Sequence, residues 1–347
     1  MTIEQRPVPS TTIVTGAAGW LGTALVVRLA AEGRALRLGV LNDAERAHVL
    51  SVAPDAAVVV GDISAPGVAA ELLAGAADPA TTDVLHVAGI IHPPKVSDFE
   101  RVNVGGTRAV LDAARRAGVR RLTHVSSNSP FGVNPTPTDV FGAEEPYRPW
   151  MGYGRSKMLA EQLVLEAHAA GDVEVSVVRP PWFYGPWQPE RQTRFFTGIR
   201  TGRFPLVGDG SNRRSMAHVD NLVDGLVLAS LVEGAAGRAY WIADRRPYPM
   251  REVVETVQQA LRQEGYEVNG RIPRLPRLAG TVAEKVDGVL QARGIYHQEI
   301  HVLGEMDKTI ACDIARAEEE LGYDPSVELL DGMVAAIRWC RARGIEL

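Results

Sequence analysis

A glycine-rich turn between a predicted strand and a predicted helix constrains this chain more than any other feature. The β-branched run of residues 11–16 predicts a buried strand, and the apolar stretch 21–31, which ends before Gly33, predicts a helix. Between them the chain reads Thr15-Gly16-Ala17-Ala18-Gly19-Trp20-Leu21-Gly22. Glycines in this pattern permit a tight turn and close approach of the backbone to a pyrophosphate, which meets the free N–H groups of the helix N-terminus. The turn therefore predicts a dinucleotide site.

Strands and helices continue to alternate after this turn. Predicted strands lie at 36–41, 56–60, 84–88, 121–125 and 173–178, and predicted helices at 99–117 and 153–170. Strands that alternate with helices pack as a parallel sheet with helices on both faces. The predicted fold class is therefore α/β, a doubly wound parallel Rossmann sheet with a smaller, mostly helical C-terminal substrate-binding domain.

The regular alternation of strands and helices ends after residue 180, which indicates two regions with different functions. We predict a dinucleotide-binding domain over residues 1–180, to which 216–245 returns with a helix and a strand, and a substrate-binding region over 181–215 and 246–347. Residues 180–215 are rich in Pro, Gly, Arg and aromatics, which is typical of loops that shape a pocket. The helical tail contains a Pro/Arg segment at 271–277, and the Ala-rich stretch 68–80 is interpreted as compositional bias.

Composition and charge exclude several classes of function. The net charge of −5 argues against nucleic acid as a partner, because phosphate backbones require clustered cations. The chain start lacks the apolar core of a secretory signal, and no apolar stretch reaches membrane-spanning length. We therefore expect a cytoplasmic protein with a small-molecule substrate and no membrane partner. Cys312 and Cys340 are too few for a disulfide framework, and His297 and His301 lack the further ligands of a metal site, so no metal is expected.

Three polar residues indicate acid/base chemistry. Tyr153 and Lys157 are four residues apart near a helix start, so their side chains share one face. A nearby cation lowers the pKa of a tyrosine from about 10, which makes Tyr153 a candidate general acid/base. Ser127 follows the strand 121–125, at the sheet edge where such folds bind ligands. Each motif alone also fits a structural role, a surface pair or a turn serine, and only their combination indicates a site.

In this order and spacing the motifs resemble the extended short-chain dehydrogenase/reductase family, in its NAD-dependent epimerase/dehydratase and 3β-hydroxysteroid dehydrogenase-like branches. The resemblance covers nearly the whole chain. Further matching segments are Gly61-Asp62-Ile63, His86-Val87-Ala88-Gly89, Asn103-Val104-Gly105-Gly106-Thr107, Arg179 to Pro186, Gly208 to Arg214, His218-Val219-Asp220-Asn221 and Glu320 to Pro325.

The resemblance implies a role for each matching residue. Tyr153 would be the acid/base, Ser127 would be catalytic beside it, and Lys157 would hold the nicotinamide ribose and lower the pKa of Tyr153. Asn128, Trp182 and Arg214 would contact the substrate. The cofactor would contact Gly16, Gly19, Trp20, Leu21, Gly22, Asp62, Ile63, Ala88, Gly89, Asn103, Tyr153, Lys157 and Pro180. A homodimer through the helices 103–117 and 153–170 is also implied.

The identity of the cofactor, NAD or NADP, stays open at this point. An acidic residue at the end of the second strand favours NAD, and an arginine favours NADP. This chain has Val40, Leu41 and Asn42 there, with Asp43 and Arg46 just beyond.

Three functions fit these motifs. We favour an NAD(P)-dependent oxidoreductase or epimerase acting on a nucleotide-activated sugar, because Arg214 matches an arginine that grips diphosphate in such enzymes. The surrounding loop is rich in arginines, namely Arg191, Arg194, Arg200, Arg203, Arg213 and Arg214. Dehydration of the sugar is disfavoured, since Asn128 and Ser129 stand where dehydratases of the family carry Asp and Glu.

The second function is an oxidoreductase for a more apolar hydroxy or keto compound. The segments 240–244 and 313–317 are similar to the 3β-hydroxysteroid dehydrogenase-like branch, and Trp182 and Phe183 suit an apolar substrate face. The third, of another class, is a non-catalytic dinucleotide-sensing protein, but such proteins typically lose the Tyr153/Lys157 pair.

Overall fold

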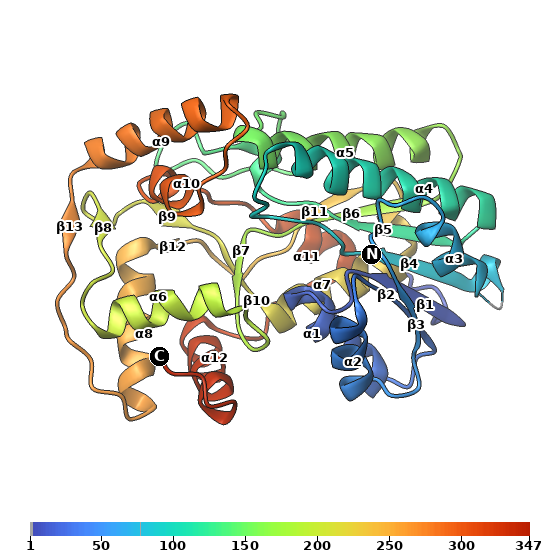
Figure 1. Cartoon of the computed structure of the whole chain (residues 1–347), viewed down its shortest axis with the longest axis horizontal. Coiled ribbons are helices and arrows are strands. Elements are labelled where there is room, and N and C mark those ends of the chain that lie inside the picture. Colours follow the sequence, from blue (N-terminus) through green and yellow to red (C-terminus); the bar gives the residue numbers. More distant parts are fainter. Residues whose placement is uncertain (1–2, 77) are drawn as a thin grey trace.

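The centre of the computed structural model, which describes residues 3–76 and 78–347, is a seven-stranded parallel sheet (Figure 1). Its strands are β1 (Thr11–Thr15), β2 (Leu36–Val40), β3 (Ala57–Val60), β4 (Thr82–His86), β5 (Arg121–Val125), β6 (Val175–Arg179) and β11 (Ala239–Trp241). They are ordered β11-β6-β5-β4-β1-β2-β3. The chain runs from β1 to one edge, returns to β4 and continues to the other edge. The carboxyl ends of β1 and β4 therefore flank the switch point where doubly wound sheets bind ligands.

Helices cover both faces of this sheet, which confirms the predicted α/β doubly wound class. On one face lie α1 (Trp20–Ala31), α2 (Asp43–Val52), α7 (Val219–Leu231) and α11 (Ala315–Leu321). On the other lie α3 (Val68–Ala74), α4 (Gly106–Ala117) and α5 (Met151–Ala169). Every residue of β4, β5 and β6 is buried, because both faces of these strands are covered.

A second hydrophobic cluster forms beside the sheet from α6 (Glu190–Arg200), α8 (Met250–Gln263) and α12 (Leu329–Ala342). Three short strand pairs lie outside the main sheet: β7 (Trp182–Tyr184) with β10 (Met216–His218), β9 (Arg213–Arg214) with β12 (Tyr248–Pro249), and β8 (Leu206–Val207) with β13 (Arg274–Leu275). The remaining helices, α9 (Arg277–Ala292) and α10 (Gln298–Glu305), pack together, and α9 contacts α5 (Figure 1). No helix in the described part of the chain combines the length and apolarity needed to cross a membrane.

Four helical segments differ from the sequence prediction. In α2 only Val49 is buried, so its apolar periodicity is weak, although Asn42 caps its N-terminus by accepting from the Glu45 N–H. Helix α3 lies in the Ala-rich stretch and buries two leucines. Helix α6 lies in the segment predicted as loops, where it buries phenylalanines such as Phe196. The predicted helix 99–117 begins as a π-helix, Phe99–Gly105, and continues as α4.

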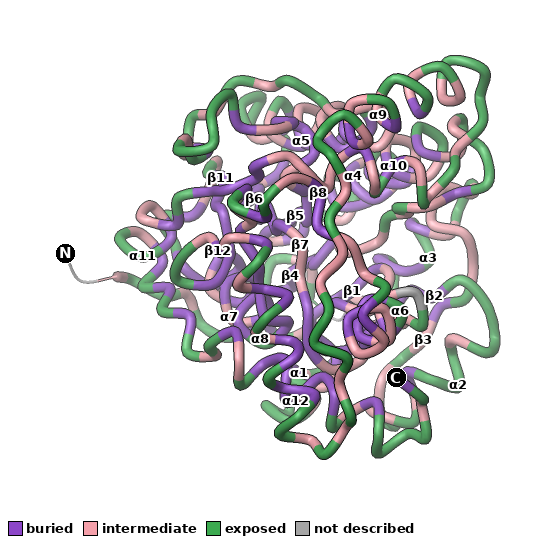
Figure 2. Tube along the Cα trace, turned by 90° about the vertical axis from the view of Figure 1, so that its left-hand side faces the viewer, coloured by how far each residue is buried: buried purple, intermediate pink, exposed green. Residues whose placement is uncertain are grey.

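Burial follows the same layering (Figure 2): the buried segments run through the sheet and the inner sides of its helices. Residues 219–241 lie with the main sheet, since β11 pairs with β6 and α7 packs on β5 and β6.

Candidate active site

A cleft of about 1900 Å³ runs along the carboxyl ends of the main strands. Pockets for one small ligand occupy roughly 300–1000 Å³, so this cleft has room for two ligands. Sixteen of the predicted site residues line it: Gly16, Gly19, Trp20, Leu21, Gly22, Asp62, Ile63, Ala88, Gly89, Ser127, Asn128, Tyr153, Lys157, Pro180, Trp182 and Arg214. The structure therefore brings together residues that lie up to nearly two hundred positions apart in the sequence.

The glycine turn joins β1 to α1 and lies against the end of β4. Gly16 has φ +65°, and a Cβ there would lie 2.7 Å from the Ala88 Cα. A Cβ on Gly22 would lie 2.1 Å from the Gly16 carbonyl oxygen. Side chains at these two positions are excluded by backbone, so the turn keeps an open surface at the N-terminus of α1. Trp20 is fixed at its edge by a 2.7 Å hydrogen bond from Nε1 to the Pro186 carbonyl.

The ends of β2 and β3 each bring a carboxylate to the cleft. Asp62 accepts hydrogen bonds from the backbone and hydroxyl of Ser64 and pairs with Arg101 at 2.7 Å. Burial opposes ionisation of Asp62, but these bonds together lower its pKa. Glu45, on α2, accepts a 2.7 Å hydrogen bond from the Leu41 N–H and also lines the cleft. Sequence reasoning missed Glu45 because α2 was not predicted.

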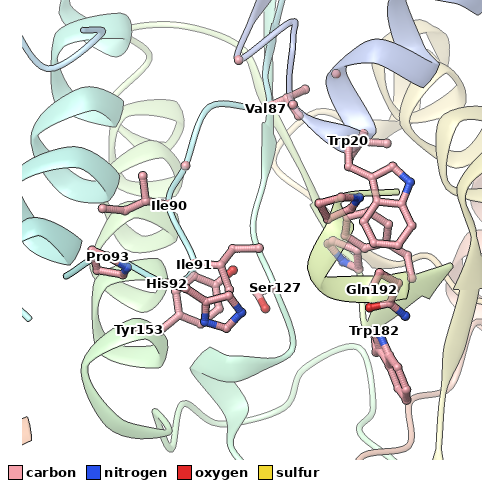
Figure 3. Close-up of a pocket in the computed structure, with 18 of the residues that line it drawn as sticks. Trp20, Val87, Ile90, Ile91, His92, Pro93, Ser127, Tyr153, Trp182 and Gln192 are labelled. Carbon is pink, nitrogen blue, oxygen red and sulfur yellow. The ribbon is translucent and has the colours of Figure 1, made fainter. Parts of the chain in front are cut away.

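Ser127 and Tyr153 meet at the other end of the cleft. Ser127 follows β5 and is nearly buried, while Tyr153 lies in the first turn of α5. The Ser127 hydroxyl donates to the Ser129 hydroxyl at 3.4 Å and accepts from the Ser129 N–H at 3.3 Å, and it lies close enough to the Tyr153 phenol to lower its pKa. Both side chains lie on the wall of the cleft opposite Trp182 and Gln192 (Figure 3). A carbonyl or hydroxyl oxygen placed here meets two hydroxyl groups.

The electrostatics of Tyr153 differ from the sequence expectation that Lys157 lowers its pKa. Burial raises the pKa of Tyr153, the Ser127 hydroxyl opposes the rise, and the Glu305 carboxylate adds to it. Lys157 is directed to the strand below, where Nζ donates a 2.6 Å hydrogen bond to the Val125 carbonyl. Burial lowers the pKa of Lys157 to about 8. Desolvation therefore dominates and the phenol is held protonated.

Asn103 is the one predicted contact residue that does not line the cleft. Its side chain accepts from the Ile90 N–H and donates to the Ile90 carbonyl and to the Ser156 hydroxyl. Asn103 thus fixes the segment after β4, which carries Ala88 and Gly89, to α5.

The end of the cleft beyond Tyr153, away from the glycine turn, has predominantly apolar walls. Aromatic and aliphatic side chains come from β7, α6, α8, α10 and the segments after β4 and around β8. They are Ile90, Ile91, Trp182, Phe183, Phe195, Phe204, Met250, Leu275, Val302, Leu303, Met306 and Ile310. An apolar ligand surface of matching shape would be desolvated here.

Arg214 is the main cation of this end, and a carboxylate accompanies it. Its guanidinium donates to the Glu305 backbone carbonyl. Burial lowers the pKa of Arg214, and the charges of Glu305 and Asp307 oppose that shift. Glu305 also lines the cleft, so the arginine charge is partly balanced by the protein itself.

The arginine-rich loop does not converge on the cleft. Besides Arg214, only Arg194 lines it among the side chains described for this loop. Arg213 donates to the carbonyls of Pro137 and Asp139, and Arg200 lies over the Tyr266 ring. Arg203 is exposed, and the Arg191 side chain lies outside the described part.

Helices α9 and α10 add polar groups that sequence reasoning did not place at the site. Gln291 accepts from the Gly152 N–H, next to Tyr153, and donates to Asp287. Asp287 also pairs with His301 at 2.7 Å, and His301 lines the cleft. The contact between Gln291 and Gly152 joins residues 139 positions apart, which no local sequence pattern reveals.

Comparison with known proteins places this geometry in context. The model of the NAD dependent epimerase/dehydratase family matches residues 12–243. The uncharacterised protein y4nL of Sinorhizobium fredii is 49% identical over 263 residues, 75% of this chain and 74% of that protein. A 4-hydroxy-2-methyl-3-oxo-4-farnesyl-3,4-dihydroquinoline-1-oxide ketoreductase of Stigmatella aurantiaca is 31% identical over 334 residues, 93% of this chain and 95% of that protein. The crystal structure of DesIV, a dTDP-glucose 4,6-dehydratase from Streptomyces venezuelae with NAD and TYD bound, has a TM-score of 0.75 and 26% identity, and covers 96% and 98% of the two chains.

Proposed function

The chain belongs to the NAD-dependent epimerase/dehydratase family, and on that premise we propose that it is an NAD-dependent oxidoreductase that interconverts a secondary alcohol and a ketone. One observation carries the proposal. The phenol of Tyr153 and the Ser127 hydroxyl line one end of a cleft whose other end is the glycine turn. A proton-transfer group and a dinucleotide cradle thus share one cavity.

The residues present fit a dinucleotide. The backbone leaves no space for a Cβ at Gly16 or Gly22, so the turn at the start of α1 presents bare peptide groups to a pyrophosphate. Glu45 supplies the acidic group that favours unphosphorylated ribose, which supports NAD over NADP. When bound, the nicotinamide supplies the hydride acceptor or donor of the reaction.

The residues of the chain provide the proton chemistry. In oxidation, Tyr153 takes the proton of the substrate hydroxyl, and in reduction it returns a proton to the carbonyl oxygen. The Ser127 hydroxyl donates to the same substrate oxygen and orients it. Lys157, held by the Val125 carbonyl, stands one helical turn from Tyr153 and would hold the ribose of the cofactor.

We further propose that the substrate is a comparatively apolar hydroxy or keto compound. The walls around Trp182, Phe195 and Phe204 support this, since they offer mainly aliphatic and aromatic surface. Glu305 beside Arg214 weakens the attraction for a diphosphate. The quinoline-oxide ketoreductase is a relative of matching length whose name states a keto group beside a farnesyl chain.

A nucleotide-activated sugar, oxidised, reduced or epimerised, is the second candidate. Arg214 favours it, because a buried guanidinium at the substrate end can grip a diphosphate. Asn128 and Ser129 still argue against dehydration of such a sugar, as neither supplies a carboxylate.

Turnover with two substrate panels tests these proposals. Oxidation of NADH would be followed with apolar ketones, such as a 3-ketosteroid and a long-chain 3-ketone, and separately with UDP- and dTDP-4-keto sugars. Turnover restricted to the sugars would overturn the apolar assignment. Tyr153→Phe should lower turnover by roughly 10²–10⁴-fold while NAD binding persists. A sensor would be identified instead if the wild type binds the dinucleotide but turns over neither panel, and if Tyr153→Phe leaves that binding unchanged.

The assembly and location of the protein stay predictions. A homodimer through α4 and α5 would give twice the mass of one chain in light scattering, and cell fractionation would test the cytoplasmic location.

A further inference from the structure

Helix α9 turns an apolar face outward. Its buried residues, Gly280, Ala283 and Asp287, lie on the side that packs against the protein. The opposite side carries a stripe at positions i, i+4, i+8 and i+11, formed by Leu278, Val282, Val286 and Val289. Their exposed fractions are 69%, 51%, 42% and 52%. The outward side of a surface helix is normally polar, whereas α9 carries its large apolar side chains on that side.

Neighbouring side chains enlarge this face. Ile295 and Val302 are also exposed, so that six of the eleven large apolar side chains exposed in the described residues lie between 278 and 302. An apolar groove between α9 and α10 is lined by Pro276, Leu278, Ala279, Val282, Ala283, Val286, Ile300 and Leu303. Isolated exposed apolar residues are ordinary, but a cluster of this kind marks an interaction surface.

Exposed cations surround the stripe. They come from the Pro/Arg segment that leads into α9, from the helix itself beside the stripe, and from the residue that follows the helix. They are Arg271, Arg274, Arg277, Lys285 and Arg293. Of the acidic groups nearby, Asp287 is buried and Glu284 pairs with Lys308 at 3.0 Å. Asp209 pairs with Arg277 at 3.5 Å, and Glu299 of α10 lies 4.0 Å from Arg194, so Arg271, Arg274, Lys285 and Arg293 supply the unbalanced positive charge. The chain as a whole carries a net charge of −5, so this face is opposite in sign to the protein average.

We propose that this face, α9 with residues 271–276, Ile295 and Val302, binds the surface of an anionic lipid bilayer. Leucine and valine side chains enter the boundary between headgroups and acyl chains, while the long stems of Lys285 and Arg293 carry their charges to the phosphates. The positive charge of the face favours an anionic bilayer over a second copy of the chain. In a symmetric dimer through this face, the like charges of the two copies would repel each other.

The face adjoins the cleft, since Leu303 lines both the apolar groove and the cleft. A bilayer on this face would lie beside the apolar end of the cleft. The proposal concerns binding alone and does not depend on the reaction proposed above.

Vesicle flotation of the full-length protein tests the proposal. The protein would be mixed with vesicles of phosphatidylcholine alone or of phosphatidylcholine with one quarter phosphatidylglycerol. We expect flotation with the anionic vesicles, about tenfold more than with the neutral ones, and a decline at high salt. Absence of flotation, or equal flotation with both vesicles, overturns the proposal.

Variants of the face supply the second test. Leu278→Ser/Val282→Ser should reduce flotation at least as much as removal of the anionic lipid. Arg274→Gln/Arg277→Gln should reduce it with anionic vesicles only. Val8→Ser is the matched control, because Val8 is 62% exposed and lies outside α9 and α10. Unchanged flotation of the Leu278→Ser/Val282→Ser variant overturns the proposal. So does a dimer of the wild type that this variant dissociates, because the face would then belong to a second copy.

Discussion

The N–H of Leu41 donates a 2.7 Å hydrogen bond to the carboxylate of Glu45, and this contact places an acid at the end of β2 although the strand itself ends without one. Replacing Glu45 by Gln should lower the preference for NAD over NADP, because a carboxylate repels the 2′-phosphate and accepts from ribose hydroxyls. The ratio of the two dissociation constants should fall about tenfold, as expected for loss of a charged hydrogen bond worth about 1.5 kcal/mol. Titration of each cofactor, followed by protein fluorescence, measures the ratio.

The control for Glu45 is Asp43→Asn, in the same first turn of α2 but outside the cleft lining. An equal change in both variants would mean that helix stability, and not the position of the carboxylate, sets the preference.

Gly22→Ala should abolish dinucleotide binding and destabilise the protein. The added Cβ would lie 2.1 Å from the Gly16 carbonyl oxygen, so the turn and α1 must separate. Gly234→Ala is the control, since its Cβ would meet no atom within 4 Å. Calorimetric titration with NAD checks binding, and retention of wild-type affinity by Gly22→Ala would contradict a tight phosphate turn.

Glu161→Gln should lower the free energy of unfolding by about 3–5 kcal/mol, because it leaves the buried guanidinium of Arg179 without its counter-charge. Glu161 is fully buried and accepts from Arg179, the Ser126 hydroxyl and the Tyr147 hydroxyl. Urea unfolding measures the loss. The exposed pair of Arg245 and Asp324 is the comparison, where Arg245→Gln should cost less than about 1 kcal/mol.

The pKa of Lys157 predicts a dependence of stability on pH. Burial lowers that pKa from 10.5 to about 8, so between these values the unfolded chain binds a proton that the folded chain lacks. The free energy of unfolding therefore rises with pH from about 8 to 10.5, by roughly 3 kcal/mol in all. The difference between the wild type and Lys157→Met, measured by denaturant unfolding across this range, isolates the effect. A constant difference would show that the ammonium is not desolvated.

Glu305→Gln should shift the pH profile of alcohol oxidation to lower pH. The Glu305 carboxylate raises the pKa of Tyr153, and oxidation requires the phenolate, so removal of the charge makes the active form available earlier. The profile of kcat against pH measures the shift. Glu299→Gln, which removes another carboxylate of the cleft lining, should leave the profile in place.

The strands and the glycine turn could be predicted because their signals are local. The run 121–125 is buried on both sides in the sheet, and the string from Gly16 to Gly22 has few uses other than a phosphate turn. The helix 153–170 agrees with α5 to within two residues at its start. Local signals failed for α2, which buries only Val49 and so lacks a clear apolar face, and for α6, which lies among prolines and arginines.

The polar details of the site were beyond sequence reasoning for a different reason. The direction of Lys157 depends on the Val125 carbonyl, thirty-two positions away, and the contact of Gln291 with Gly152 spans 139 positions. The pKa of Tyr153 depends on how much water the assembled walls exclude. Such properties arise only when folding has assembled all the walls of the cleft.

The two opposite walls of the cleft are formed by elements that pack in different hydrophobic clusters. The groups that handle protons come from β5 and α5, while Trp182, Phe195 and Phe204 belong to the cluster of α6, α8 and α12. An enzyme built in this way can change its substrate by mutation of the second cluster, while its catalytic residues stay unchanged. Natural divergence within the family, and laboratory redesign of this chain, would both be expected to work through those aromatic side chains.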